Sequence, residues 1–203
     1  NALKTIQKGA IGDVLRIHCR MGGYAKPCDT WRGSRTISGG ILYDWGVHLL
    51  EYSLQILQGG LMEVTGFASL GYWADKTKWK EDTHEDEGFA VVRFDSGQWL
   101  TLCVSTIDAN APAHWLEITG TKGTYTFDVN TYELIQTKGR KVVRTRGRNP
   151  EGEWWQYYGN IADHLTRGTP LVITPEWSRR PIHVLDLAVR SAKAGKSLRA
   201  KYA

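Results

Sequence analysis

This sequence is poor in cysteine and in long apolar runs, and each shortage excludes a class of protein. Its three cysteines, Cys19, Cys28 and Cys103, are widely spaced, and none belongs to a Cys-x-x-Cys pair. That pattern argues against a disulfide framework and against a cysteine–histidine metal site. We therefore expect reduced, buried thiols in a cytoplasmic compartment. No apolar run approaches the roughly 18 uncharged residues that span a membrane, so we expect no membrane partner.

The chain also lacks an initiator methionine and the apolar core of a signal peptide. It begins at Asn1, so we expect it to be part of a longer protein. Hydrophobic residues make up 41% of the 203 positions, and nine of the residues are tryptophan. This composition can fill a substantial core and excludes a disordered chain. We find no internal repeat and no low-complexity segment.

The net charge is +5, but the positive charges gather in one short segment. The segment contains Lys138, Arg140, Lys141, Arg144, Arg146 and Arg148. Such a cluster can bind phosphate or nucleic acid. It can also be a solvated edge hairpin, whose charges discourage pairing with other sheets. We favour the hairpin and expect no nucleic-acid partner, because no aromatic RNA-binding motif or recognition helix accompanies the cluster.

Short apolar runs separated by turn signals predict many strands, flanked by helices at both ends of the chain. The predicted strands cover residues 14–21, 63–72, 88–94, 99–106, 115–119, 123–128, 132–136 and 142–146. The predicted helices cover residues 3–8, 40–57, 153–166 and 175–194, and a long loop covers residues 22–37. The arrangement indicates an α+β fold, an open and mostly antiparallel sheet with helices on one face. Because apolar residues occupy both parities of strand 99–104, we expect the other face to be an oligomer interface.

The most informative feature is the helix at 40–57, which places Asp44 and His48 four residues apart near its start. At 100° per residue, the helix has one polar stripe about 80° wide. The stripe consists of Asp44, His48, Glu51, Gln55 and Gln58. A helix whose narrow stripe meets water explains the last three residues well. Asp44 and His48 fit it less well, because they follow two glycines at the junction of a long loop and a helix.

Two interpretations of the Asp44 and His48 pair remain open from the local pattern. The pair can be a structural hydrogen bond between residues one helical turn apart. Alternatively, the carboxylate can orient the imidazole, which then exchanges a proton with a substrate hydroxyl or carbonyl. Gly39 and Gly40 precede the pair and would permit close approach of a ligand to the backbone.

The segment Gly-Gly-Ile-Leu-Tyr-Asp-Trp-Gly-Val-His at 39–48 resembles the GG-x-x-x-D-x-G-x-H signature of the Gfo/Idh/MocA oxidoreductases. These are the relatives of glucose–fructose oxidoreductase and inositol dehydrogenase. Residues 9–14 resemble the strand that enters their C-terminal domain, and Trp31-Arg32 resembles a Trp-Arg pair before their Gly-Gly helix. Residues 120–124, 168–174 and 191–196 resemble later family motifs. Each motif is weak alone, but the ordered set covers nearly the whole chain.

The resemblance implies a two-domain enzyme, of which residues 1–203 are the C-terminal substrate-binding and oligomerisation domain. The N-terminal Rossmann domain that binds NAD or NADP is not expected here, because no G-x-G-x-x-G follows a strand. The implied activity transfers hydride between a sugar or polyol-like alcohol and nicotinamide, within a dimer or tetramer formed through the sheet face. The isolated chain is then expected to be inactive. The alternatives are an NAD-dependent glycoside hydrolase of the same superfamily and a non-catalytic oligomerisation or ligand-sensing domain.

The resemblance also implies roles for individual residues. The catalytic residues would be Asp44 and His48, with His48 moving the hydroxyl proton. The expected substrate-binding residues are Trp31, Arg32 and Tyr157, and the expected cofactor-binding residues are Gly39 and Gly40. The Glu-Lys-Pro motif of many relatives is missing, and Lys26 is interpreted as a loop residue. We expect a solvated loop and no metal at residues 84–87, because the spacing of these acidic and histidine side chains fits no standard site.

Overall fold

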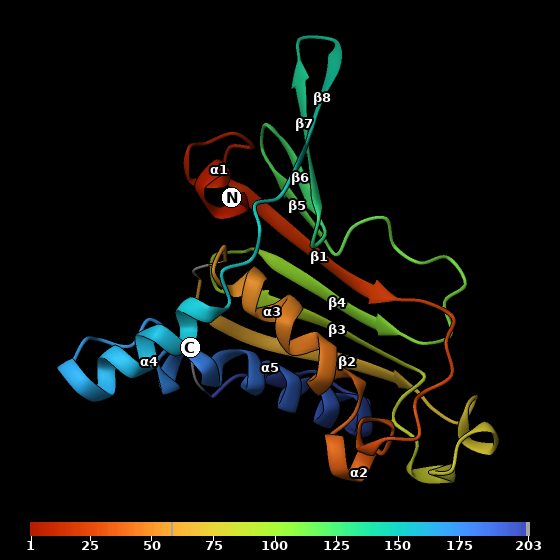
Figure 1. The fold of residues 1–203 in the computed structure, drawn as a ribbon. Helices are drawn as coiled ribbons and strands as arrows, with labels where there is room; N and C mark the ends of the chain where they lie inside the picture. The colour runs from red at the N-terminus through yellow and green to blue at the C-terminus, as the bar shows by residue number, and fades with distance from the viewer. Residues whose placement is uncertain (58, 202–203) are drawn as a thin grey trace.

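Alternating apolar positions in the middle of the chain build one sheet. In the computed structural model, which describes residues 1–57 and 59–201, nine strands form an open sheet in the order β8-β7-β6-β5-β1-β4-β3-β2-β9 (Figure 1). The strands are β1 (Val14–Gly22), β2 (Leu61–Ser69), β3 (Glu87–Phe94), β4 (Trp99–Ser105), β5 (Leu116–Gly120), β6 (Gly123–Phe127), β7 (Thr131–Lys138), β8 (Lys141–Arg148) and β9 (Leu198–Arg199). Each described pairing is antiparallel except that of β1 with β4. The predicted α+β class with a mostly antiparallel sheet is confirmed.

Two helices cover one face of the central strands. The described helices are α1 (Ala2–Gln7), α2 (Arg35–Ser38), α3 (Val47–Leu54), α4 (Trp155–Arg167) and α5 (Pro175–Ala194). Figure 1 shows α3 and α5 lying side by side across β2, β3 and β4. The core between these layers includes Leu49 and Leu185 from the helices and Leu100 and Leu102 from the sheet. None of the described helices is both long and apolar enough to cross a bilayer.

Local signals define the ends of the longest helix. The hydroxyl of Thr174 accepts a hydrogen bond from the Trp177 amide at 3.2 Å, and Pro175 occupies the first helical position. Gly195 ends the helix in the left-handed conformation, with φ of 62°. Capping hydroxyls, N-terminal proline and C-terminal glycine are favoured at these positions. The predicted bounds of 175–194 are therefore confirmed.

The predicted helix at 40–57 is interrupted. Residues Leu42–Gly46 form a π turn, and regular α-helix begins only at Val47. The turn presses closely against the sheet and α5, because a Cβ atom at Gly46 would lie 3.2 Å from Leu102 and 3.4 Å from Leu185. Single π turns inside helices often occur at functional sites. Gln58 of the predicted polar stripe lies outside the described residues.

The second face of the sheet is not covered by a helix among the described residues. Along β4, Trp99, Thr101 and Cys103 are half-buried on that face, whereas Leu100 and Leu102 are fully buried on the other. The expectation that both faces of this strand are buried is therefore not met within one chain. The expected oligomer interface stays a prediction.

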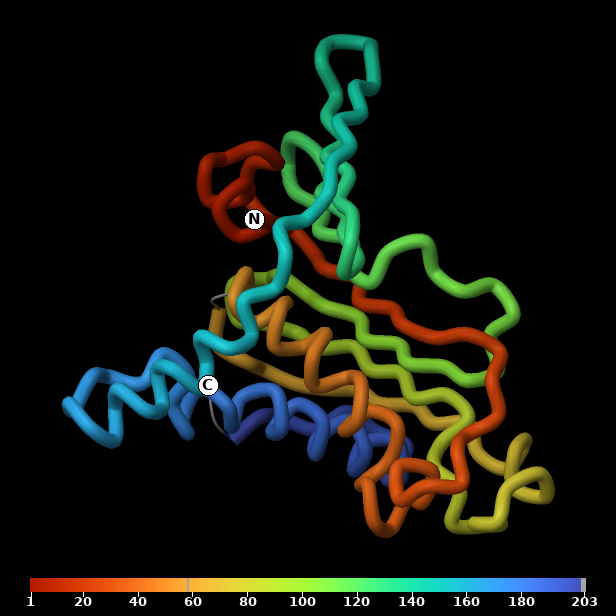
Figure 2. Tube along the Cα trace, viewed as in Figure 1, coloured from red at the N-terminus to blue at the C-terminus, as the bar shows by residue number. Residues whose placement is uncertain are grey.

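Two parts of the molecule extend away from the sheet core. The hairpin β7–β8 projects from one end of the sheet (Figure 1), and β8 is the exposed edge strand. Its basic side chains are partly neutralised, because Arg144 and Arg146 each donate to Glu133 at 2.8 Å. The predicted charged edge hairpin is confirmed. Helix α4 projects to the left of the sheet, beyond the ends of the strands (Figure 2), and none of its residues is buried.

Candidate functional site

An open pocket of about 450 Å³ lies where the long loop, the π turn and the segment before β3 meet. Its lining consists of Cys28, Arg32, Ile41, Asp44, Trp45, His48, His84 and Thr106. The pocket thus unites three of the residues predicted from sequence, Arg32, Asp44 and His48. Its volume falls in the usual range for sites that bind small molecules.

An ion pair spans this pocket. Arg32 donates a hydrogen bond through its guanidinium to the carboxylate of Asp44, whose side chain is only 22% exposed. The same guanidinium lies 5.0 Å from the ring centre of Trp31, a cation–π distance. Trp31 therefore supports Arg32 from outside the pocket lining. The pair places a fixed cation and a fixed carboxylate side by side at the pocket wall.

His48 is exposed at the first turn of α3 and points into the same pocket space. Its ring centre lies 6.0 Å from that of Trp45. Within the part of the chain that the structure describes, Asp44 hydrogen-bonds to Arg32 and not to His48. The expected hydrogen bond between Asp44 and His48 is absent among the described residues, because a π turn replaces the regular helical turn at Asp44. The exposed position expected of an acid–base residue is present, whereas its catalytic role stays a prediction.

The segment before β3 is buried, so the expectation of a solvated loop there is wrong. His84, Glu85 and Asp86 are 9%, 7% and 2% exposed. The Asp86 carboxylate accepts hydrogen bonds from the amides of Tyr72 and Trp73 at 2.8 and 3.2 Å. Buried carboxylates are tolerated when backbone donors satisfy them. No group of three or more metal-ligating side chains occurs among the described residues.

The two glycines of the Gly-Gly segment have separate structural reasons, and Glu85 accounts for the second, Gly40. Its carboxylate accepts a hydrogen bond from the Ile41 amide at 3.0 Å, at the start of the helical segment. Gly40 has φ of 109°, and a Cβ atom there would lie 2.4 Å from Glu85 Oε2. Gly39 ends α2 in the left-handed conformation, with φ of 88°. Neither glycine lines the pocket around His48, and their cofactor contact stays a prediction.

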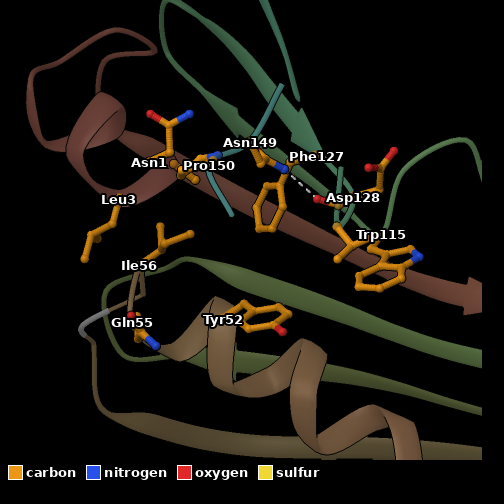
Figure 3. Close-up of a pocket in the computed structure, with 12 residues that line it drawn as sticks. Asn1, Leu3, Tyr52, Gln55, Ile56, Trp115, Phe127, Asp128, Asn149 and Pro150 are labelled. Carbon is orange, nitrogen blue, oxygen red and sulfur yellow. Dashed lines mark hydrogen bonds between the residues drawn. The ribbon is translucent and has the colours of Figure 1, made fainter. Parts of the chain in front are cut away.

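A second pocket of about 320 Å³ lies between α1, α3 and the ends of β5 and β6 (Figure 3). Tyr52, Trp115 and Phe127 form its aromatic walls. At its rim the Asn149 side-chain amide donates to the carbonyl oxygen of Asp128 at 2.7 Å. The aromatic walls suit packing or apolar contact, whereas proton transfer requires the groups around His48. We therefore place the candidate site at the first pocket.

Comparison with known proteins identifies the family of this chain. The family described as GFO/IDH/MocA C-terminal domain matches residues 1–126. The chain belongs to this family. The match includes the long loop, the Gly-Gly segment and the π turn, and so every residue of the first pocket.

Individual relatives are similar to this chain over most of its length. A 2,7-anhydro-N-acetylneuraminate hydratase of Escherichia coli K12 is 27% identical over 183 residues, which are 87% of this chain and 48% of the relative. An NAD binding oxidoreductase from Klebsiella pneumoniae is 20% identical with a TM-score of 0.79, over 100% of this chain and 63% of that one. Levoglucosan dehydrogenase in complex with NADH and levoglucosan is 16% identical with a TM-score of 0.81, over 100% and 63%. The chain therefore spans about half to two thirds of these relatives.

The structure does not bring Tyr157 to the first pocket. This residue lies on α4, is 46% exposed, and packs edge-on against Tyr158 with ring centres 5.3 Å apart. It is not part of the pocket lining. The predicted contact between Tyr157 and the substrate stays a prediction. It would require another part of the whole protein to bring Tyr157 close to the first pocket.

Five lining residues were not predicted as site residues from sequence, namely Cys28, Ile41, Trp45, His84 and Thr106. Thr106 is fully engaged, since its hydroxyl donates to the Asp86 carbonyl at 2.9 Å and accepts from Trp73 Nε1 at 3.1 Å. Trp45 lies inside the Gly-Gly signature, which was a signal for it. His84 adjoins two carboxylates in sequence, but their spacing suggested only solvent exposure.

The cysteines differ sharply in environment: Cys19 is buried, Cys103 is half-buried, and Cys28 is exposed, so the expectation of buried thiols is confirmed only for Cys19. Cys28 is exposed at the pocket, and the Thr30 hydroxyl 2.9 Å away lowers the pKa of its thiol. Burial raises the pKa of Cys19 to about 12 and that of Cys103 to about 11.

We expect iodoacetamide at pH 7.5 to alkylate Cys28 first. Each pKa unit changes the thiolate fraction about tenfold, so Cys103 should react at least about 100-fold more slowly. Cys19 should react only when the protein unfolds, because it is also inaccessible. Peptide mass spectrometry over a time course measures the three rates. Equal rates for Cys28 and Cys103 would contradict the environments described above.

Proposed function

We propose that this chain is the substrate-binding domain of an NAD(P)-dependent oxidoreductase that acts on a sugar or polyol-like alcohol. The observation that carries the proposal is the first pocket, where His48 shares one cavity with the Arg32–Asp44 ion pair. An exposed imidazole beside a fixed carboxylate and cation suits proton transfer to or from a bound hydroxyl. The levoglucosan dehydrogenase neighbour, a protein whose structure contains NADH and a sugar, supports the substrate class.

In this proposal each pocket residue has a defined task. His48 accepts the proton of the substrate hydroxyl as its carbon is oxidised and returns it in the reverse direction. Asp44, held in place by Arg32, accepts a hydrogen bond from the substrate and fixes its orientation. The nicotinamide ring would take up the hydride when the cofactor is bound. The pocket offers proton-transfer groups but no glycine-rich phosphate loop, so the dinucleotide would be held by a separate Rossmann domain of the whole protein.

The full-length protein tests this proposal. It should bind NADH or NADPH with micromolar or better affinity, measured by nucleotide fluorescence, and reduce NAD(P) when a suitable sugar is added. Residues 1–203 alone should bind the nucleotide at least about 100-fold more weakly, because the phosphate-binding helix terminus would be missing. A full-length protein that binds neither nucleotide would overturn the proposal and favour a ligand-sensing or oligomerisation domain.

A second candidate is supported by the hydratase relative. A whole enzyme that oxidises its sugar transiently, cleaves a bond and returns the hydride would use the same His48 and Asp44. It would release a sugar product without net NADH formation. Following absorbance at 340 nm together with product release by chromatography distinguishes the two activities.

We further propose that the uncovered sheet face joins two copies of the chain. Thr101 lies near its centre, where its hydroxyl is 2.7 Å from His18 Nδ1. Sedimentation of the wild-type protein should give twice the chain mass, and Thr101→Arg should give the single-chain mass by inserting a charge into the interface. Gln7→Arg adds the same charge on exposed α1 and should leave the dimer intact. A monomeric wild type at high concentration would contradict this arrangement.

A further inference from the structure

The first pocket contains a second imidazole, that of His84. The hydrogen bonds of this ring determine which of its nitrogen atoms can face a ligand. His84 is 9% exposed, and its Nδ1 lies 2.7 Å from the carbonyl oxygen of Glu85. A carbonyl oxygen can only accept, so Nδ1 donates. In the neutral ring, Nε2 therefore carries the free lone pair.

No protein group among the described residues satisfies that lone pair. Nε2 of His84 has no hydrogen-bond partner there, although the residue lines the pocket with Arg32, Asp44 and His48. Nε2 is not among the fully buried side-chain atoms that lack a partner, so it is accessible from the open pocket, where a ligand hydroxyl can donate to it.

The backbone holds the ring in this position. The His84 amide donates to the carbonyl of Gly33 at 3.0 Å, and Ser34 and Thr83 form a bridge immediately beside it. On the other side, Glu85 is bonded to the Ile41 amide. The ring is thus fixed between the loop that carries Arg32 and the turn that carries Asp44. Preorganised acceptors of this kind contribute to affinity because little entropy is lost on binding.

The chemistry of the pocket points to hydroxyl groups as the ligand. A hydroxyl can donate to His84 Nε2 and also accept from a neighbouring donor such as Arg32. A carboxylate lacks the hydrogen that Nε2 requires, and either a carboxylate or a phosphate would face the negative charge of Asp44. We propose that His84 is a substrate-binding residue whose Nε2 accepts a hydrogen bond from a second hydroxyl of the substrate, beside the hydroxyl at His48. This deepens the proposed function and rests on it for the identity of the substrate as a sugar or polyol.

The test uses the full-length protein and a panel of levoglucosan, L-sorbose, glucose and myo-inositol. Binding is measured by calorimetry, and the imidazole nitrogens are followed by long-range ¹H–¹⁵N NMR. His84→Phe keeps a planar ring but removes the acceptor, and should weaken the tightest-binding sugar roughly tenfold to 100-fold. His84→Gln retains an acceptor oxygen and should stay within about threefold of wild type. His114→Phe is the matched control outside the pocket and should change nothing.

The expected NMR result is a sugar-dependent shift of the His84 Nε2 resonance in the wild type. Unchanged sugar affinity in a folded His84→Phe protein would overturn the proposal, as would a panel in which no sugar shifts that resonance. Thermal melting identifies a variant that fails to fold. If His84→Phe fails to fold, the proposal is tested by the Nε2 shift in the wild type and by the sugar affinity of His84→Gln. The binding readouts need no turnover, so sugar binding through His84 without any NAD(P) reduction would refute the proposed oxidoreductase activity and leave this site standing.

Discussion

Replacing His48 by alanine is expected to lower turnover of the full-length enzyme by roughly 10²- to 10⁴-fold, the usual contribution of a positioned acid–base group. His48 is exposed in the pocket that also contains Asp44 and Arg32, so its removal should disturb packing little. Affinity for NADH or NADPH should change less than about threefold, because the nucleotide would be held mainly by another domain. Steady-state kinetics and nucleotide fluorescence measure the two quantities separately.

The control for this experiment is His114→Ala. His114 is a half-buried histidine outside the pocket lining, with its Nδ1 4.0 Å from Asp128. Its replacement should leave turnover within about threefold of wild type. Full turnover of the His48→Ala protein would remove His48 from the proposed chemistry. The experiment applies equally to the transient-oxidation alternative, because that cycle also needs the proton transfer.

Replacing Gly40 by alanine is expected to destabilise the fold by about 2–6 kcal/mol and to displace the π turn. Two effects contribute. At φ of 109° an L-residue is strained, typically at a cost of about 1–3 kcal/mol. The new methyl group would also lie 2.4 Å from Glu85 Oε2 and push the carboxylate away from the Ile41 amide. Leaving such buried groups unpaired costs about 1–3 kcal/mol more. Urea unfolding followed by fluorescence measures the loss.

Gly71→Ala separates the two effects. Gly71 has φ of 101°, close to that of Gly40, but a Cβ atom there would meet nothing within 4 Å. This control should show the backbone strain alone. The double variant Gly40→Ala/Glu85→Ala removes the crowded carboxylate, so the two substitutions should be clearly non-additive. Equal losses for Gly40→Ala and Gly71→Ala would show that Glu85 does not determine the need for glycine at position 40.

Elements whose signals are local were predictable. The helix at 175–194 begins and ends at Thr174 and Gly195, which act on their own neighbours in the chain. The strands were predicted from the alternation of apolar residues, a local pattern that indicates which face of a strand is buried but not which strand lies beside it. The parallel pairing of β1 with β4 and the addition of β9 beside β2 were not predicted, because partner choice joins segments far apart in sequence.

The site divides in the same way. The Gly-Gly segment with Asp44 and His48 could be recognised from contiguous residues. The partner of Asp44 could not, because Arg32 reaches it across a loop and a π turn that replaces the expected regular helix. Residues 84–86 were expected in solvent, since three charged or polar neighbours usually lie there. They are buried instead, and backbone amides from distant turns satisfy the carboxylates of Glu85 and Asp86.

The amino-acid sequence by itself determined the fold class, the family and two of the residues that line the pocket, because composition, periodicity and a contiguous motif carry that information. Only the tertiary structure decided that Asp44 pairs with Arg32, that Gly40 makes room for Glu85, and that His84 lines the same pocket as His48. These are contacts between segments 12 to 45 positions apart. Their energies depend on packing and desolvation, which exist only once the chain has folded.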